Sequence, residues 1–326
     1  MEKPEIAEEL TIEAALRPKN WSDYIGQDKI KRNLRVILDA AKKRKESPDH
    51  LLFYGQAGLG KTTLAHLVAT DIGAHLRVTS GPALEKMGDV AAILSNLEPN
   101  DILFIDEIHR LNHLIEEVLY PAMEMRKLHM VIGKGPAART LSLDLPPFTL
   151  LAATTKPHLL SGPLRSRFGA SFKLDYYEPK DIEQIVVRSA IALGLDLTPD
   201  AVRVIAQASR FTPRVANRLL KRARDYASVN DITIIDEDCA KKTMAMLEID
   251  ALGLEPSDRR LLEVIIQKFE GGPVGINTLA AALSDDPQII EDVYEPYLMR
   301  LGLLTRTSSG RVVTPEAYTH LATVKV

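Results

Sequence analysis

The sequence has very little cysteine and no long apolar run. Its one cysteine, Cys239, excludes a framework of disulfides within the chain. The first residues, Met1 to Glu5, have neither the basic flank nor the apolar run of a secretory signal. No apolar stretch approaches the roughly 18 residues that a membrane span requires. These absences predict a cytoplasmic protein that does not enter a membrane.

An excess of positive charge is absent as well. The formal net charge is −3, which gives no overall attraction to nucleic acid, so any DNA contact must come from local basic groups. Apolar residues make up 45% and charged residues 26%, the balance of a folded globular protein. A chain of 326 residues fits two or three domains, each with its own core.

Changes in pattern along the chain predict an arm and three domains. The arm is polar and acidic, and its alternative interpretation is a disordered tail. Short apolar runs then alternate with helical patterns, which favours a parallel sheet flanked by helices. The expected divisions are an arm at 1–19, a large α/β domain at 20–180, a small all-helical domain at 181–253 and a winged-helix domain at 254–326.

The two C-terminal domains are predicted from helical periodicity. Strand patterns stop near residue 181, and 3.6-residue repeats take over, with Thr212-Pro213 as a good helix start. After Gly253, three helical stretches precede two short strands around the turn Ser308-Ser309-Gly310. Three helices and a hairpin are the order of a winged helix, and a three-helix bundle with a frayed tail is the alternative.

A phosphate-binding loop follows the apolar run 51–54. Gly55 to Thr62 fits the pattern G-x-x-x-x-G-K-[ST], between a strand and a helix as the motif requires. The glycines let backbone N–H groups surround phosphate, and the helix N-terminus adds positive potential. Lys61 reaches the β and γ phosphates and Thr62 can ligate Mg²⁺. The sequence therefore predicts ATP and Mg²⁺ as cofactors, with a binding loop that includes Gly58, Leu59, Gly60, Lys61, Thr62 and Thr63.

Polar residues end the next two apolar strands. Asp106 and Glu107 follow the run 102–105, at the sheet edge where ligands of such folds bind. We expect Asp106 to hold Mg²⁺ and Glu107 to activate the attacking water. Thr155 follows the run 149–153 and would place a hydroxyl near the γ-phosphate. An acidic pair after a strand is by itself usually a solvated turn. The presence of a P-loop earlier in the chain is what favours a catalytic role for this pair.

Three arginines have candidate roles at this site. Arg165 and Arg167 fall after the core strands, where a subunit edge would lie, and an arginine there could reach a neighbour's site as arginine fingers do. Their alternative is a solvated surface. Arg214 lies in the first turn of a helix, where a cation opposes the macrodipole, so an anion such as bound nucleotide should compensate it.

Together these motifs resemble the RuvB family of AAA+ motors, from about residue 14 to about residue 320. The resemblance is carried by sets of residues specific to that family rather than to AAA+ proteins at large. They are Leu16-Arg17-Pro18, Tyr24-Ile25-Gly26-Gln27, the P-loop, Thr79 to Glu85, Phe104 to Leu111, Tyr120-Pro121-Ala122-Met123-Glu124, Gly135-Pro136-Ala137-Ala138-Arg139, Leu143 to Thr149, Ala153-Thr154-Thr155 and Thr212 to Arg218.

The resemblance implies a fold and a set of roles. The fold is a P-loop AAA+ core, a small helical lid and a winged helix. The family's activity is ATP-driven translocation of duplex DNA, which drives branch migration of Holliday junctions in recombination and repair. Matching positions make Lys61, Thr62 and Asp106 the Walker residues, Glu107 the catalytic acid, Thr155 the first sensor, Arg167 the trans-acting finger, Arg214 the second sensor, and Arg17, Tyr24, Ile25 and Tyr177 the surroundings of the adenine.

Partners are also implied by the resemblance. They are RuvA, a homohexameric ring, the duplex arms of the junction, and RuvC in the full resolvasome. A β-hairpin before the sensor strand docks RuvA in this family, and here Leu141 and Leu143 supply an apolar edge, while Leu145 is expected to face the sheet. The family's wing contacts one DNA backbone, and Arg306 and Arg311 flank the hairpin turn, where they would bind phosphate. From residue 255 onward seven Lys/Arg stand against ten Asp/Glu, so contact should be confined to the wing.

One departure and two alternatives complete the prediction. Gln56-Ala57 stands where RuvB proteins commonly have two prolines, which leaves the loop less restrained but keeps every phosphate-facing group. A DNA-binding switch of the initiator or clamp-loader type would share the AAA+ core. An ATP-binding module without turnover would not need Glu107, Thr155 or Arg167.

Overall fold

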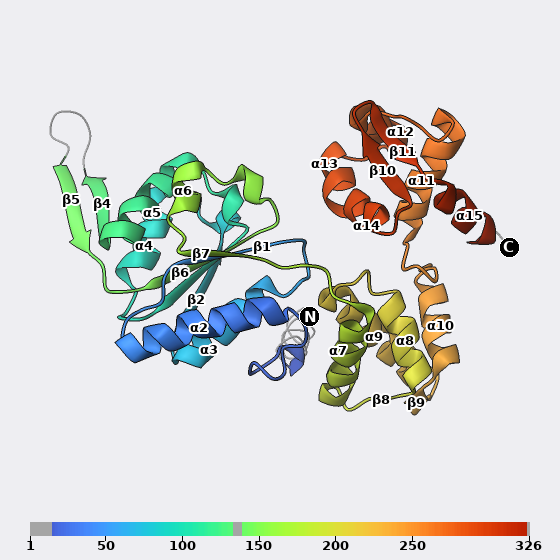
Figure 1. Ribbon diagram of the computed structural model, residues 1–326, viewed down its shortest axis with the longest axis horizontal. Helices are drawn as coiled ribbons and strands as arrows, with labels where there is room; N and C mark the ends of the chain where they lie inside the picture. Colours follow the sequence, from blue (N-terminus) through green and yellow to red (C-terminus); the bar gives the residue numbers. More distant parts are fainter. Residues whose placement is uncertain (1–14, 133–138, 325–326) are drawn as a thin grey trace, which may run out of the picture. The chain divides into compact units, whose positions relative to one another are not determined.

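The computed structural model describes residues 15–132 and 139–324 (Figure 1). Its α-helices are α2 (Asp28–Arg44), α3 (Lys61–Ile72), α4 (Met87–Ser95), α5 (His113–Met125), α6 (Gly162–Ser166), α7 (Pro179–Ala192), α8 (Pro199–Gln207), α9 (Pro213–Val229), α10 (Glu237–Met246), α11 (Pro256–Phe269), α12 (Ile276–Leu283), α13 (Pro287–Ile289), α14 (Glu295–Arg300) and α15 (Pro315–Val324). Its strands are β1 (Leu51–Tyr54), β2 (Leu76–Ser80), β3 (Ile102–Asp106), β4 (Lys127–Ile132), β5 (Arg139–Asp144), β6 (Thr149–Thr154), β7 (Ala170–Lys173), β8 (Asp196–Leu197), β9 (Ile234–Ile235), β10 (Leu304–Thr307) and β11 (Gly310–Val313).

The chain folds as two compact units. The first contains the residues up to Asp181 together with Thr212–Arg214. The second contains Ile182–Phe211 and the chain from Val215 onward. Within the described ranges, no helix is both long and apolar enough to cross a bilayer.

The first unit is built around a five-stranded parallel sheet in the order β2-β3-β6-β1-β7. The central strands β1, β3 and β6 are almost entirely buried, which explains their continuous apolar runs. β2 and β7 are the edge strands and are partly exposed, so they lack such runs. The three central strands were therefore predicted from the sequence, and the structure adds the edge strands β2 and β7.

Helices cover both faces of this sheet (Figure 1). On one face, Leu94 of α4 and Ile115 and Leu119 of α5 join Leu103 and Leu150 of the sheet in one buried cluster. α2 and α3 cover the other face. Because all five strands are parallel, their carboxyl ends meet at one edge, and the loops that follow β1, β3 and β6 lie together there.

The strands β4 and β5 form an antiparallel hairpin beside the main sheet, inserted before β6. Leu143 pairs with Leu128, and Leu141 pairs with Met130. Leu128 is buried in the main core, which anchors the base of the hairpin. The motif segment Gly135 to Ala138 between the strands lies outside the described residues, as do residues 1–14 of the predicted arm.

The second unit begins with the helices α7 to α10. Thr198 and Asp236 cap α8 and α10 by accepting hydrogen bonds from backbone N–H groups with their side chains. α9 begins at Pro213, as the Thr212-Pro213 pair predicted. The expectation that strands stop after residue 181 was wrong in one detail, because β8 and β9 form a two-residue parallel pair. Strands this short have no periodicity to detect.

The rest of the second unit contains α11 to α15 and the hairpin β10–β11, around one core that includes Leu261, Leu279, Leu298 and Val313. Leu304 pairs with Val313, so the predicted wing is present and the bundle with a frayed tail is excluded. A π-helical turn, η5 (Ile290–Tyr294), joins α13 to α14. The final helix, α15, was not predicted from the sequence.

Candidate nucleotide site and wing

The P-loop connects the carboxyl end of β1 to α3. Gly58 has φ +81°, and a Cβ at this position would lie 2.9 Å from the Cβ of Arg214. The backbone N–H of Arg214 donates to the carbonyl of Gly58 at 3.4 Å. Glycine is needed here because both the φ value and the close approach exclude a side chain. The structure thus brings Arg214, predicted to sense nucleotide, against the phosphate-binding loop.

Lys61 is buried at the start of α3. Its Nζ donates to the carbonyls of Gly55 and Gln56, both at 2.8 Å. Burial lowers the pKa of this ammonium, while the carboxylates of Glu107 and Asp106 act in the opposite direction. The lysine is therefore held inside the loop by two carbonyl groups and faces the acidic end of β3.

Thr62 and Asp106 form an oxygen pair at the same edge. The Thr62 hydroxyl donates to Asp106 Oδ2 at 3.4 Å, and the Glu107 N–H donates to Asp106 Oδ1 at 2.9 Å. Mg²⁺ prefers oxygen ligands and usually takes only one or two from protein beside phosphate and water. The pair fits that ion, and no cluster of three or more His, Cys, Asp or Glu ligands occurs within 15–132 and 139–324.

Glu107 is held by two side chains and by its backbone. The Thr155 hydroxyl donates to Glu107 Oε2 at 3.1 Å, and His109 Nδ1 lies 3.2 Å from the same oxygen. Glu107 itself has φ +48°, a rarely populated conformation. A Cβ on Gly81 would lie 2.4 Å from the Glu107 carbonyl oxygen, so Gly81 is what allows this backbone to pass. His109 was not predicted from the sequence, although it stands two residues after the predicted catalytic acid.

Two tyrosines pack behind the P-loop, where adenine surroundings were expected. Tyr24 and Tyr177 are buried, with their hydroxyl oxygens 3.2 Å apart. Tyr177 also donates to the carbonyl of Leu59 at 3.2 Å. Burial, followed by the neighbouring Tyr177, raises the pKa of Tyr24. Ile25 is partly exposed next to them. The tyrosines therefore support the loop from behind.

Arg17, Arg165 and Arg167 lie elsewhere on the first unit. Arg17 Nη1 lies 2.7 Å from Nε2 of His66 in α3. Arg165 is exposed in α6. Arg167, the C-cap of α6, lies over the ring of Tyr120 at 4.4 Å and forms an ion pair with Glu124 at 3.2 Å. Both contacts come from the Tyr-Pro-Ala-Met-Glu motif in α5.

The wing arginines differ from the prediction. Arg306 and Arg311 pair across the hairpin, but both guanidinium groups contact carboxylates of η5 and α14. Arg311 is only 7% exposed, and its Nε donates to Glu295 Oε1 at 2.6 Å. Arg306 Nη2 lies 2.7 Å from both Glu291 and Glu295. The two predicted phosphate contacts thus differ in exposure: Arg311 is a buried partner of Glu295, while the Arg306 side chain is half exposed. The reason is that hairpin residues directly opposite each other share a face, and this face packs on the helix.

The hairpin leucines agree with the expected exposure pattern. Leu141 is 46% exposed and Leu143 is 38% exposed, whereas Leu145 is 6% exposed and belongs to the main core. Residues 141–144 are all exposed, so Leu141 and Leu143 stand clear of the core, and Leu145 is buried where the chain returns to the sheet.

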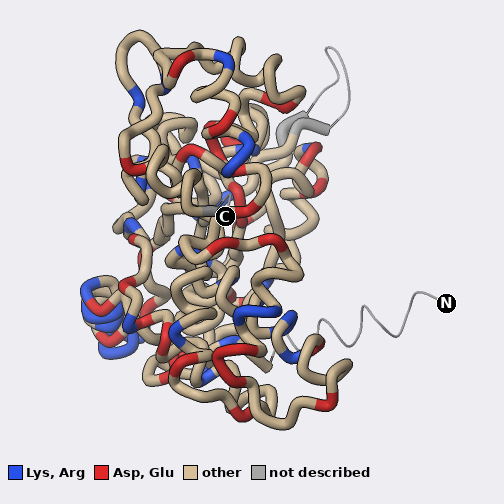
Figure 2. The backbone as a smooth tube through the Cα atoms, turned by 90° about the vertical axis from the view of Figure 1, so that its right-hand side faces the viewer, with Lys and Arg blue, Asp and Glu red and all other residues tan. Residues whose placement is uncertain are grey.

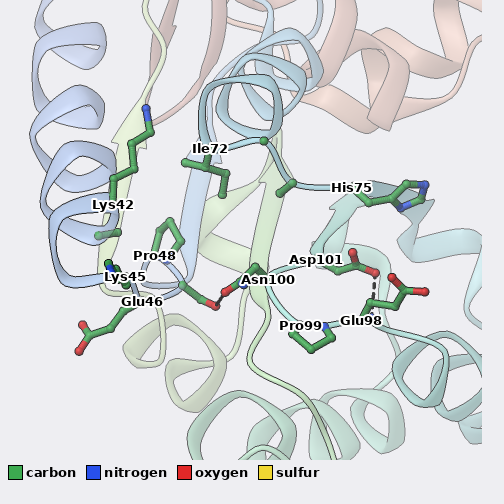
Figure 3. Close-up of a pocket in the computed structure, with 14 residues that line it drawn as sticks. Lys42, Lys45, Glu46, Pro48, Ile72, His75, Glu98, Pro99, Asn100 and Asp101 are labelled. Atoms are coloured by element: carbon green, nitrogen blue, oxygen red, sulfur yellow. Dashed lines mark hydrogen bonds between the residues drawn. The ribbon is translucent and has the colours of Figure 1, made fainter.

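A cavity of about 490 Å³ lies at the amino ends of the strands, opposite the P-loop edge (Figure 3). Of its lining side chains, Lys42 pairs with Asp71, and the Ser47 hydroxyl donates to Asn100. Because it lies at the opposite edge of the sheet, the cavity does not belong to the nucleotide site. Basic and acidic positions are interspersed along the backbone, in line with the net charge of −3 (Figure 2).

Comparison with known proteins gives matches over nearly the whole chain. Residues 16–174 match the Holliday junction DNA helicase RuvB P-loop domain, residues 177–250 the RuvB AAA lid domain, and residues 251–322 the RuvB C-terminal winged helix domain. The solved structure of the Thermotoga maritima RuvB Holliday junction branch migration motor is similar, with 47% identity, a TM-score of 0.86, and coverage of 94% of this chain and 98% of that chain. An alanine-to-serine variant of the same protein matches with equal identity and coverage and a TM-score of 0.87.

Proposed function

The chain belongs to the RuvB family, and we propose that it acts as that family's ring-shaped motor, a cytoplasmic homohexamer that works with RuvA on Holliday junctions. It is an ATP-hydrolysing DNA motor with an AAA+ core, a helical lid and a winged helix. In this proposal the ring pulls the duplex arms of the junction and drives branch migration in recombination and repair, and RuvC joins the complex for resolution.

The observation that supports hydrolysis is the meeting of three groups at one sheet edge. Lys61 follows β1, Glu107 follows β3, and Thr155 follows β6, with Thr155 bonded to Glu107 at 3.1 Å. In the proposed roles, Lys61 binds the β and γ phosphates and Glu107 Oε1 takes the proton of the attacking water. Thr155 orients Glu107. A module that only bound ATP would have no need of this acid and its donor.

The groups assigned to Mg²⁺, to the phosphates and to the adenine are all on the P-loop unit. Thr62 and Asp106 would hold Mg²⁺ directly or through water, and the ion would neutralise charge on the phosphates. Gly58 to Thr63 supply the phosphate-facing backbone N–H groups at the start of α3. Arg17, Tyr24, Ile25 and Tyr177 are assigned to the surroundings of the adenine and the hinge behind the loop.

Two arginines complete the site. Arg214 approaches the P-loop in cis, because its backbone contacts Gly58 and its helix starts beside the phosphate position. Arg167 lies at the end of α6 and is held by Tyr120 and Glu124 rather than by the P-loop of its own subunit. We therefore assign Arg167 to the site of the neighbouring subunit, where it stabilises transition-state charge.

The two macromolecular contacts are assigned to separate elements. Leu141 and Leu143 give the β4–β5 hairpin an exposed apolar edge for RuvA. In the wing, Arg306 is the phosphate contact, and Arg311 fixes its position through the shared carboxylates. The initiator and clamp-loader alternative is set aside, because the RuvB-type core, lid and winged helix are matched together in one chain.

Subunit mixing tests the shared active site. Glu107→Gln and Arg167→Ala should each abolish ATP hydrolysis alone. In an equimolar mixture, about a quarter of the head-to-tail interfaces combine an intact Glu107 with an intact neighbouring Arg167. We expect ATPase activity to return to about that fraction of wild type. A mixture as inactive as its components would contradict the trans assignment, and full activity of Glu107→Gln alone would contradict the catalytic site.

A further inference from the structure

His109 lies in the short helix η2 (Ile108–Arg110), directly after the acidic end of β3. Its side chain is 9% exposed, and Nδ1 lies 2.8 Å from the Thr154 hydroxyl oxygen and 3.2 Å from Glu107 Oε2. Thr154 is fully buried at the end of β6. The imidazole is thus placed between the proposed catalytic acid and the last residue of β6, directly before the proposed sensor Thr155.

The contacts determine which nitrogen carries the proton. An ionised carboxylate only accepts hydrogen bonds, so Nδ1 must be protonated to be favourable 3.2 Å from Glu107 Oε2. The Thr154 hydroxyl oxygen already accepts from the backbone N–H of Lys156 at 3.0 Å, and it can accept from His109 as well. The Nδ1–H group is therefore shared between Thr154 and Glu107.

Both donors meet the same carboxylate oxygen. His109 Nδ1 and the Thr155 hydroxyl both lie against Glu107 Oε2, at 3.2 and 3.1 Å. With Oε2 occupied, the other oxygen, Oε1, is the one left to accept a proton from water. The backbone of Glu107 is also fixed, because its N–H donates to Asp106 Oδ1 and its carbonyl accepts from the Arg110 N–H, both at 2.9 Å. The orientation of the acid is thus set from three sides.

We propose that His109 is a positioning residue for ATP hydrolysis: it holds Glu107 Oε2 through Nδ1–H and so directs Oε1 toward the attacking water. The inference rests on the proposed role of Glu107. His109 takes no proton in the reaction and does not touch nucleotide. Its effect is on the rate of the chemical step, because a catalytic group that rotates away from its working geometry loses most of its advantage.

Three variants in the full-length protein test this role. His109→Ala should lower kcat by about 10- to 100-fold with KM changed by less than about threefold, since only the transition-state arrangement is lost. His109→Asn offers an N–H donor near the position of Nδ1 and should restore kcat to within about fivefold of wild type. His113→Ala is the matched control, because that histidine is exposed in α5 and contacts only Glu117 among the pairs described, so kcat should stay unchanged.

Thermal unfolding and binding of fluorescent ADP, measured on the same variants, separate positioning from folding. Unchanged ADP affinity with reduced kcat in His109→Ala, and recovery in His109→Asn, support the proposal. A kcat for His109→Ala within about twofold of wild type would overturn it, as would an Asn variant that binds ADP normally but remains as slow as Ala. Glu107→Gln is run in parallel: if it is inactive while His109→Ala is fully active, only the role of His109 fails, and the proposed function stands.

Discussion

Arg210 meets both carboxylate oxygens of Asp258, at 3.2 and 3.3 Å, in a nearly buried ion pair. The guanidinium also lies over the ring of Tyr297 at 4.4 Å. Burial raises the pKa of Asp258, and Arg210 acts against that rise. The pair joins the loop before α9 to the first helix of the winged helix. Arg210 is separated by one residue from Thr212–Arg214, the segment that belongs to the P-loop unit.

Removing the cation of this pair should destabilise the second unit. We expect Arg210→Met to lower its free energy of unfolding by about 3 kcal/mol, because Asp258 is left as an unpaired buried charge. Without Arg210 the pKa of Asp258 rises further, so the penalty is present when the carboxyl is ionised and fades as the pH falls and it is protonated. Denaturant unfolding at about pH 8 and about pH 5 should show a smaller loss at the lower pH.

Arg218→Met is the control for that experiment. Its ion pair with Glu255 is largely exposed, so the loss should stay below about 1 kcal/mol and be insensitive to pH in the same range. An equal loss of stability in both variants at both pH values would contradict the prediction, because it would show that the burial of Asp258 does not set the cost of losing its arginine partner.

The contact between Arg167 and Tyr120 predicts a second effect on catalysis. Tyr120→Leu removes the aromatic ring under the guanidinium and should lower kcat about tenfold, because the finger loses its orientation. Tyr120→Phe keeps the ring and loses the hydroxyl bonds to Glu116 and Ser161, so it should stay near wild type. ATPase assays of the two variants test this prediction. Equal activities would show that the Tyr120 ring does not orient Arg167.

The ion pair between Arg306 and Glu291 predicts opposite effects on DNA affinity when one or the other residue is replaced. Arg306→Ala should weaken duplex binding for all sequences and reduce the slope of log K against log salt by about 0.9. Glu291→Gln should strengthen binding, because Glu291 competes with phosphate for Arg306. Glu316→Gln, an exposed change on α15, is the control for charge alone. Fluorescence anisotropy at several salt concentrations measures all three, and equal gains in both Glu variants would mean that only net charge matters.

The hairpin predicts a partner defect without an ATPase defect. A double change of Leu141 and Leu143 to Asp should abolish binding to RuvA, because two charges replace the exposed apolar edge. Basal ATPase activity should be unchanged, since the hairpin is outside the nucleotide site. Val36→Asp, an exposed apolar residue on α2, serves as control. RuvA pull-down with the double variant at wild-type strength would exclude this docking surface.

Much of the nucleotide site could be predicted from the sequence because its signals are local. Lys61 and Thr62 follow a strand within a spaced motif, and Asp106 and Glu107 end a buried strand. Continuous apolar runs predict the central strands, whereas the edge strand Leu76–Ser80 has no such run. His109 carries no such signal, because its contact with Thr154 depends on two strands being neighbours in the sheet.

The wing shows where local signals fail. Arg306 and Arg311 beside a turn look like exposed phosphate ligands in sequence. Their true surroundings depend on Glu291 and Glu295, which lie on a preceding π-helical turn and helix. Only the packing of the hairpin on that helix reveals that one arginine is buried and the other half exposed.

Branch migration of a synthetic four-way junction is the most direct test of the central claim. The protein should move the junction in the presence of ATP, Mg²⁺ and RuvA, and should fail to do so with Arg167→Ala or without RuvA. Measured by gel or by fluorescence between the arms, that pattern would establish a RuvA-dependent motor with a shared active site. Normal ATP hydrolysis with no junction movement in the wild-type protein would contradict the account.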